Sequence, residues 1–252
     1  MVQTSVRPVG EWLGDSFGRL KENWLTLCGL FMFGFCVIFV GVLAVYGVGI
    51  GFLGTLQGWD NLKRAVLDPT RLQYLIEESR GAFALLNLVA LLVGLRLYCW
   101  ILKAVIHASI DPSTGFGAAL GKGNEHGYAF LGLFVMQQII LNVGLMLLIL
   151  PGIIMAIWFG FALWACARDE SGVFASLGDS ARAVKGHFFG VFGRMLVLGL
   201  IGSAMMIVPV IGWLVGAAWM MVAWGCLYED LTAPQPAPVS ARPPRIPGRV
   251  AA

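Results

Sequence analysis

The feature that most constrains this chain is a series of unbroken apolar runs, each long enough to cross a lipid bilayer. An α-helix needs about 20 apolar residues to span the hydrocarbon core. Within that core only α-helices and closed β-barrels satisfy every backbone N–H and C=O group. Barrel strands would alternate polar and apolar residues over about ten positions, and these runs do not alternate. The sequence therefore predicts an all-α fold, a polytopic transmembrane helical bundle.

Six apolar segments can be distinguished, which predicts six spans. They comprise Leu25–Phe52, Ala82–His107, Tyr128–Leu150, Pro151–Ala167, Phe188–Val208 and Val210–Leu227. The composition agrees, because 58% of the 252 residues are hydrophobic and only 12% are charged. Glycines crowd the far end of the first segment, at Gly47, Gly49, Gly51 and Gly54. They predict that the first helix frays or breaks there.

Charge and proline content divide the chain into three regions. Residues 1–24 are predicted to be a cytoplasmic N-terminus with an amphipathic helix in the membrane interface. Residues 25–231 would form the six-span domain, with an extracytoplasmic loop at residues 56–81. Residues 232–252 interleave proline with alanine and arginine, a composition that cannot bury a core and predicts a disordered cytoplasmic tail.

Lysine and arginine are distributed unevenly around the spans, and this predicts the orientation in the cell membrane. With the N-terminus inside, the opposite side carries Lys63, Arg64, Arg71 and Arg80, all in one loop that also holds acidic residues. The cytoplasmic side then carries Arg7, Arg19, Lys21, Lys122, Arg168, Arg182, Lys185, Arg242, Arg245 and Arg249. The bias predicts that both termini face the cytoplasm.

An internal repeat is the sharpest pattern in the sequence. The tetrapeptide LGDS at 13–16, followed by Lys21 and Trp24, returns at 177–180, followed at the same spacing by Lys185 and Phe188. Weaker matches relate residues 114–121 to 171–178, and residues 164–170 to 224–230. The predicted unit is a short amphipathic helix followed by two spans, present three times. Alternatively, the short helices are extensions of the spans into the cytosol.

A family resemblance rests on LPGII at 150–154, RDESG at 168–172 and SARAVKGHFF at 180–189. These motifs resemble the membrane domain of some bacterial glycerophosphodiester phosphodiesterases and related standalone six-span bacterial membrane proteins. The resemblance covers residues 148–200, with a weaker echo at 8–30, and implies a bundle in the bacterial inner membrane. The catalytic domain is absent. None of the three histidines, His107, His126 and His187, lies in an HRG segment beside Glu-x-Asp, so no catalytic residue is carried over.

Cationic residues inside the second segment form the first candidate site. Arg96, Lys103 and His107 share one helical face, and a charge at bilayer depth suggests a functional site. One hypothesis is a site for an anionic lipid headgroup or phosphate. The alternative is that Arg96 and Lys103 snorkel to the interface, which is also the interpretation of Arg194 in the fifth segment.

Uncharged polar residues in the third segment form a second candidate set. Gln138 and Asn142 lie four residues apart and are predicted to bond across to a neighbouring helix. No Asp or Glu falls inside the six segments, which argues against proton-coupled transport and intramembrane hydrolysis. The five cysteines show no CxxC spacing. We therefore predict no catalytic residue, no metal site, no cofactor and no nucleic-acid partner.

Three functional hypotheses follow. The first is a non-enzymatic scaffold or accessory protein that contacts membrane lipids, or partner proteins through the amphipathic helices or the tail. The second is a transport or lipid-handling protein in which Arg96, Lys103, Gln138 and Asn142 converge on one path. The third, an embedded enzyme, would have to gather acids at the span ends, where Asp169, Glu170, Glu229 and Asp230 lie.

Overall fold

The computed structural model describes residues 7–68, 70, 73, 77–205, 207–208 and 211–233, which form helices and turns with no strand among them. The helices are α1 (Val9–Gln57), α2 (Trp59–Leu67), α4 (Arg80–Ile110), α5 (Phe116–Asn124), α6 (Gly127–Leu147), α7 (Ile149–Phe159), α8 (Ala162–Asp169), α9 (Val173–Val184), α10 (Phe188–Met205) and α11 (Ile211–Thr232). The prediction of an all-α fold is confirmed.

Several helices are long and apolar enough to cross a membrane. In the described part of the chain they are Val9–Phe52, Arg80–Ile110, Gly127–Leu147, Ile149–Asp169 and Phe188–Met205, five in all. Their length and composition fit a multi-pass membrane protein. The sixth predicted segment corresponds to α11, whose Trp219, Val222 and Cys226 are buried in the core.

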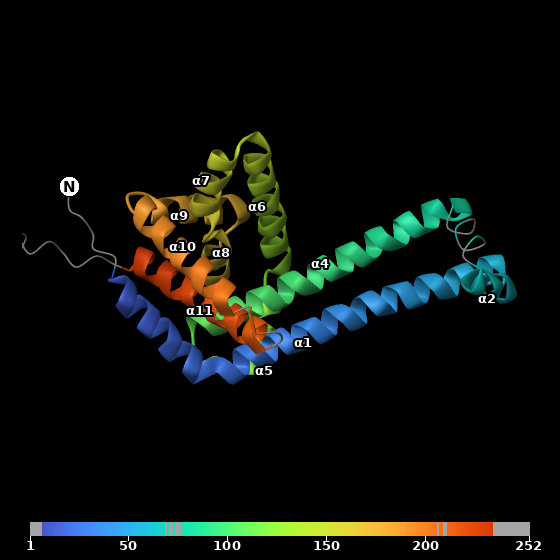
Figure 1. Cartoon of the computed structure of the whole chain (residues 1–252), viewed down its shortest axis with the longest axis horizontal. Helices are drawn as coiled ribbons and strands as arrows, with labels where there is room; N and C mark the ends of the chain where they lie inside the picture. The colour runs from blue at the N-terminus through green and yellow to red at the C-terminus, as the bar shows by residue number, and fades with distance from the viewer. Residues whose placement is uncertain are drawn as a thin grey trace, which may run out of the picture.

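The long helices pair as hairpins (Figure 1). The α1/α4 hairpin extends far from the rest of the molecule, and the α6/α7 hairpin leaves in a different direction. Of the α10/α11 hairpin, α11 lies along the N-terminal part of α1. The core sits where these elements meet, and it includes Trp12, Leu27, Phe161 and Trp219.

Helix α1 is divided by a kink at Asn23, whose backbone angles are φ −122° and ψ 16°. The Asn23 side chain is 5% exposed, and its Nδ2 donates to the carbonyl oxygen of Ala108 in α4 at 3.0 Å. This bond attaches the kink to the end of the neighbouring helix. The kink separates residues 9–22, here called the N-terminal segment, from the long apolar part of α1.

Close packing holds the two helices of the α1/α4 hairpin together. A Cβ placed on Gly41 would lie 2.7 Å from Leu97 Cδ1, and one on Gly34 would lie 2.5 Å from Ile101 Cγ2. Small residues of this kind let membrane helices approach each other. The expected break at the later glycines is wrong, because α1 continues as a helix to Gln57.

The predicted fourth span is interrupted at Gly160 and Phe161, between α7 and α8. The Ser180 hydroxyl donates to the carbonyl oxygen of Trp158 at 2.7 Å and accepts the N–H of Phe161 at 3.2 Å. Gln137 Nε2 donates to the carbonyl oxygen of Phe159 at 3.1 Å. Backbone groups freed by a broken membrane helix need such partners, and α6 and α9 supply them.

Two predicted regions lie partly outside the described residues. The loop at 56–81 contains helix α2, while residues 69, 71–72 and 74–76 are not described. Helix α11 reaches Thr232, and the predicted tail from residue 234 onward lies outside the described residues.

Candidate functional site: polar side chains between the helices

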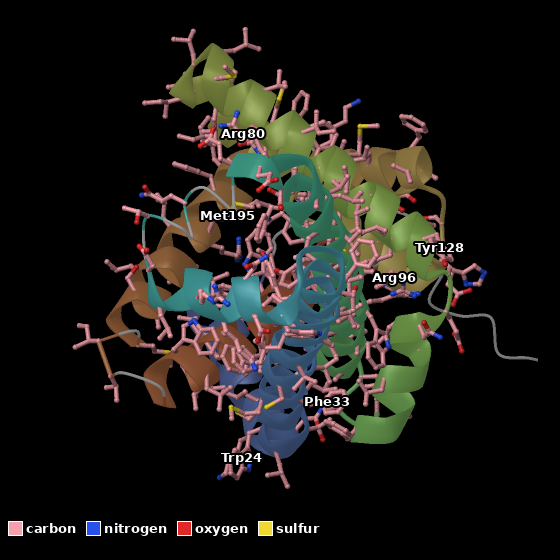
Figure 2. The ribbon with its side chains drawn as sticks, turned by 90° about the vertical axis from the view of Figure 1, so that its right-hand side faces the viewer. Trp24, Phe33, Arg80, Arg96, Tyr128 and Met195 are labelled. Carbon is pink, nitrogen blue, oxygen red and sulfur yellow. The ribbon has the colours of Figure 1, made fainter. Side chains whose placement is uncertain are left out.

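Arg96 lies beside the turn that joins α5 to α6, with its guanidinium next to Tyr128 (Figure 2). Its Nη2 donates to Oδ1 of Asn124 at 2.9 Å, and its Cζ lies 5.6 Å from the centre of the Tyr128 ring. A cation over an exposed aromatic ring contributes about 0.5–1 kcal/mol. A Cβ placed on Gly127 would lie 2.7 Å from Nη2, so the guanidinium rests against the start of α6. Arg96 therefore helps to fix this turn.

Lys103 lies two turns further along α4 and is 1% exposed. Its Nζ donates to the carbonyl oxygen of Glu125 at 2.5 Å, and Glu125 is the residue that ends α5. Helix C-termini leave carbonyl groups without intrahelical partners and attract cations. The ammonium is thus enclosed by the protein at the end of α5.

His107 lies one turn beyond Lys103 and is half-buried. Its Nε2 is enclosed and has no hydrogen-bond partner among the described residues. The three cationic residues thus share a face of α4, as predicted, but their surroundings differ. Headgroup binding by Arg96, Lys103 and His107 stays a prediction.

The polar residues of α6 behave differently from their prediction. Gln138 and Asn142 are exposed, and Asn142 Nδ2 donates to the carbonyl oxygen of Gln138 in its own helix at 2.7 Å. The residue that bonds across to a neighbouring element is Gln137, which is 7% exposed and reaches Phe159. The inter-helix amide is therefore one position away from the predicted one, on a different face of α6.

Arg194 belongs to a charged cluster where α10 and α11 meet the N-terminal segment. It is 6% exposed and donates to the carbonyl oxygens of Arg7 and, at 3.1 Å, of Gly190. The Arg7 side chain forms ion pairs with Asp230 and Asp15, and its hydrogen bond with Asp230 raises the pKa of Arg7. The Arg194 guanidinium is held inside the protein by these two carbonyl oxygens.

The acids at the span ends are distributed among separate ion pairs. Glu229 pairs with Arg19 at 2.7 Å, and Glu170 lies 3.3 Å from Nδ1 of His126. No three His, Cys, Asp or Glu residues of the described part come together as a metal site would require. The arrangement offers ion pairs at helix ends rather than a gathered acid and base.

The chain was compared with protein-family models, curated proteins and solved structures. None of the three comparisons finds a match. Interpretation of the site therefore rests on the chain's own geometry.

One arrangement recurs throughout the structure: a side-chain donor of one element bonds to a backbone carbonyl of another. The pairs are Trp12 to Ala223, Asn23 to Ala108, Trp100 to Leu120, Lys103 to Glu125, Gln137 to Phe159, Ser180 to Trp158 and Arg194 to Arg7. Sequence reasoning selected Lys103 and Arg194 as unusual but missed the tryptophan and serine donors. The repeated LGDS tetrapeptide carried a signal, because its serines, Ser16 and Ser180, are both fully buried.

Proposed function

We propose that this chain is a non-enzymatic membrane scaffold whose intramembrane polar groups hold its helices together. The observation that carries the proposal is the recurring bond from a buried side chain to a carbonyl of a neighbouring element, as at Lys103 and Gln137. Groups committed to such bonds are not available to bind or transform a substrate. The scaffold would contact membrane lipids, and partner proteins through its short helices or its tail.

The second candidate, transport, requires Arg96, Lys103, Gln138 and Asn142 to line a common path. Lys103 is enclosed near the end of α5, whereas Gln138 and Asn142 are exposed on the surface of α6. Because the set divides between interior and surface, the geometry favours the scaffold.

The proposed architecture has six spans in three units, with α11 as the sixth span. Each unit is a short helix followed by a hairpin: the N-terminal segment before α1/α4, α5 before α6/α7, and α9 before α10/α11.

Three hydrogen bonds support these units. Each of them joins a short helix to the second helix of a hairpin in another unit. Trp100 Nε1 of α4 donates to Leu120 of α5, and Ser180 of α9 donates to Trp158 of α7. Trp12 Nε1 of the N-terminal segment donates to Ala223 of α11. The third bond would close a ring of three units.

We further propose a bacterial inner-membrane location with both termini in the cytoplasm. The support is the distribution of lysine and arginine and the resemblance of residues 148–200 to a bacterial membrane domain. The short helices would then lie at the cytoplasmic interface, and α2 would lie outside.

The five lysines of the chain test the architecture and the scaffold role together. Lys21, Lys63, Lys122 and Lys185 are exposed, while Lys103 is enclosed. Intact cells are treated with a membrane-impermeant amine-acetylating reagent, and the sites are read by mass spectrometry. We expect modification of Lys63 in intact cells, of Lys21 and Lys122 only after permeabilisation, and of Lys103 in neither case. Modification of Lys122 in intact cells would overturn the orientation, and modification of Lys103 as readily as Lys122 would indicate a water-filled path instead of a scaffold.

A further inference from the structure

A groove of about 580 Å³ lies between α7, α9 and the start of α10. Its wall is apolar, formed chiefly by Ile154, Trp158, Val184 and Phe188, and two cations, Arg182 and Lys185, stand beside it. Volumes of about 300–1,000 Å³ are typical of sites for small molecules. The groove therefore joins a hydrocarbon-lined wall to a positively charged margin.

The apolar wall is incompletely covered by the protein. Trp158 is 47% exposed and Ile154 is 37% exposed, although both face the same groove. The indole of Trp158 packs at this surface while its backbone carbonyl is used by Ser180. In a membrane a lipid acyl chain is the natural cover for such a wall, because the apolar helix surface faces lipid and not water.

The two cations at the margin differ in their partners within the protein. Arg182 pairs with Asp179 and donates its Nε to the carbonyl oxygen of Gly178 at 3.4 Å. Lys185 is exposed, and its ammonium makes no hydrogen bond or ion pair with any described residue. The groove thus carries a net positive charge even with Asp179 counted.

Two helix ends meet at this margin. Lys185 follows the end of α9, and Gly186, at φ +92°, turns the chain into α10. The first turn of an α-helix has N–H groups without intrahelical partners, and its dipole attracts negative charge. The C-terminal carbonyl groups of α9 end at the same margin and have the opposite preference. The preference of the groove for an anion therefore rests on the side chains of Arg182 and Lys185.

We propose that this groove binds one anionic phospholipid, with an acyl chain along Ile154, Trp158 and Phe188 and the phosphate at Lys185 and Arg182. Only an amphiphile satisfies both parts of the groove: a free phosphate would leave the wall uncovered, and a neutral lipid would leave Lys185 unpaired. Basic pockets beside membrane helices recognise acidic headgroups in this way. The site differs from the predicted one at Arg96, Lys103 and His107, and it rests on the proposed embedding of the chain in a membrane.

The test is native mass spectrometry of the full-length protein in detergent, titrated with dioleoylphosphatidylglycerol or dioleoylphosphatidylcholine. We expect the wild type to retain phosphatidylglycerol preferentially. The double variant Arg182→Gln/Lys185→Gln should bind phosphatidylglycerol at least about tenfold more weakly. Two basic groups beside an acidic headgroup together contribute more binding free energy than a tenfold change in affinity requires. The matched control Lys63→Gln/Arg64→Gln removes the same charge from α2, remote from the groove, and should bind like the wild type.

A third variant separates occupancy of the groove from attraction to surface charge. Ile154→Trp enlarges an exposed side chain on the wall and leaves both cations in place, so it should exclude the acyl chain and lower phosphatidylglycerol retention. Retention of both lipids equally by the wild type, full retention by Arg182→Gln/Lys185→Gln, or full retention by Ile154→Trp would each overturn the proposal. Competition by inorganic phosphate as effective as that by phosphatidylglycerol would also overturn it. The lysine-modification result is independent of these outcomes, so the scaffold and the lipid site can fail separately.

Discussion

At the scale of single residues, the Ser180 hydroxyl offers a sharp test of how the α7–α8 break is stabilised. Ser180→Ala removes the donor to Trp158 and the acceptor for the N–H of Phe161. Because the site is fully buried, no water replaces the hydroxyl, and we expect a loss of about 1–3 kcal/mol in unfolding free energy. The measurement is an SDS or urea unfolding titration in mixed micelles.

Ser203→Ala is the matched control. Ser203 is exposed, and its hydroxyl bonds to Gly199 in its own helix at 2.7 Å. A substitution of that kind should change stability by no more than about 0.5 kcal/mol. Equal effects of the two substitutions would show that the break does not depend on Ser180.

The same scale shows where sequence reasoning fails. Gln137 and Gln138 are neighbours in an apolar segment, yet Gln137 is buried and Gln138 is exposed. In a soluble helix the apolar face identifies the buried side, but around a membrane helix the lipid and the protein interior are both apolar. The sequence therefore indicates that polar contacts exist in α6 without indicating which face makes them.

At the scale of elements, the α1/α4 pairing depends on close approach at Gly34 and Gly41, which sequence reasoning did not single out. Gly41→Leu should destabilise the hairpin by about 1–3 kcal/mol, because the new side chain overlaps Leu97. Gly47→Leu is the control, since nothing lies within 4 Å of a Cβ at that position of the same helix. Unfolding titrations of the two variants give the comparison, and a larger loss for Gly47→Leu would contradict the packing described for α1 and α4.

The sequence predicts where the long helices lie but not where one of them is interrupted. The apolar runs located the long helices because the thickness of the bilayer sets the length of an apolar helix that crosses it. The break between α7 and α8 was not foreseen, since the acceptor and donors that make it tolerable come from Gln137 and Ser180 on other helices. A local sequence window contains neither partner.

At the scale of the whole molecule, the first and last elements form one unit. Trp219 Nε1 donates to the buried Ser16 hydroxyl at 3.0 Å, and the Trp219 ring stacks on Phe17 with ring centres 4.9 Å apart. Ion pairs from Arg7 and Arg19 to the end of α11 flank this contact. The N-terminal segment can therefore dock only after α11 is in place.

Trp219→Ala should accordingly release the N-terminal segment, although the two are some 200 positions apart in the sequence. Large-to-small substitutions of a buried tryptophan cost about 3–5 kcal/mol, so amide hydrogen exchange of residues 9–22 should accelerate by at least about tenfold. Trp213→Ala is the control within α11, because Trp213 is 49% exposed and should leave exchange in residues 9–22 unchanged. If Trp219→Ala accelerates exchange in α11 while residues 9–22 remain protected, the two ends fold independently, and the ring of three units cannot be closed by this contact.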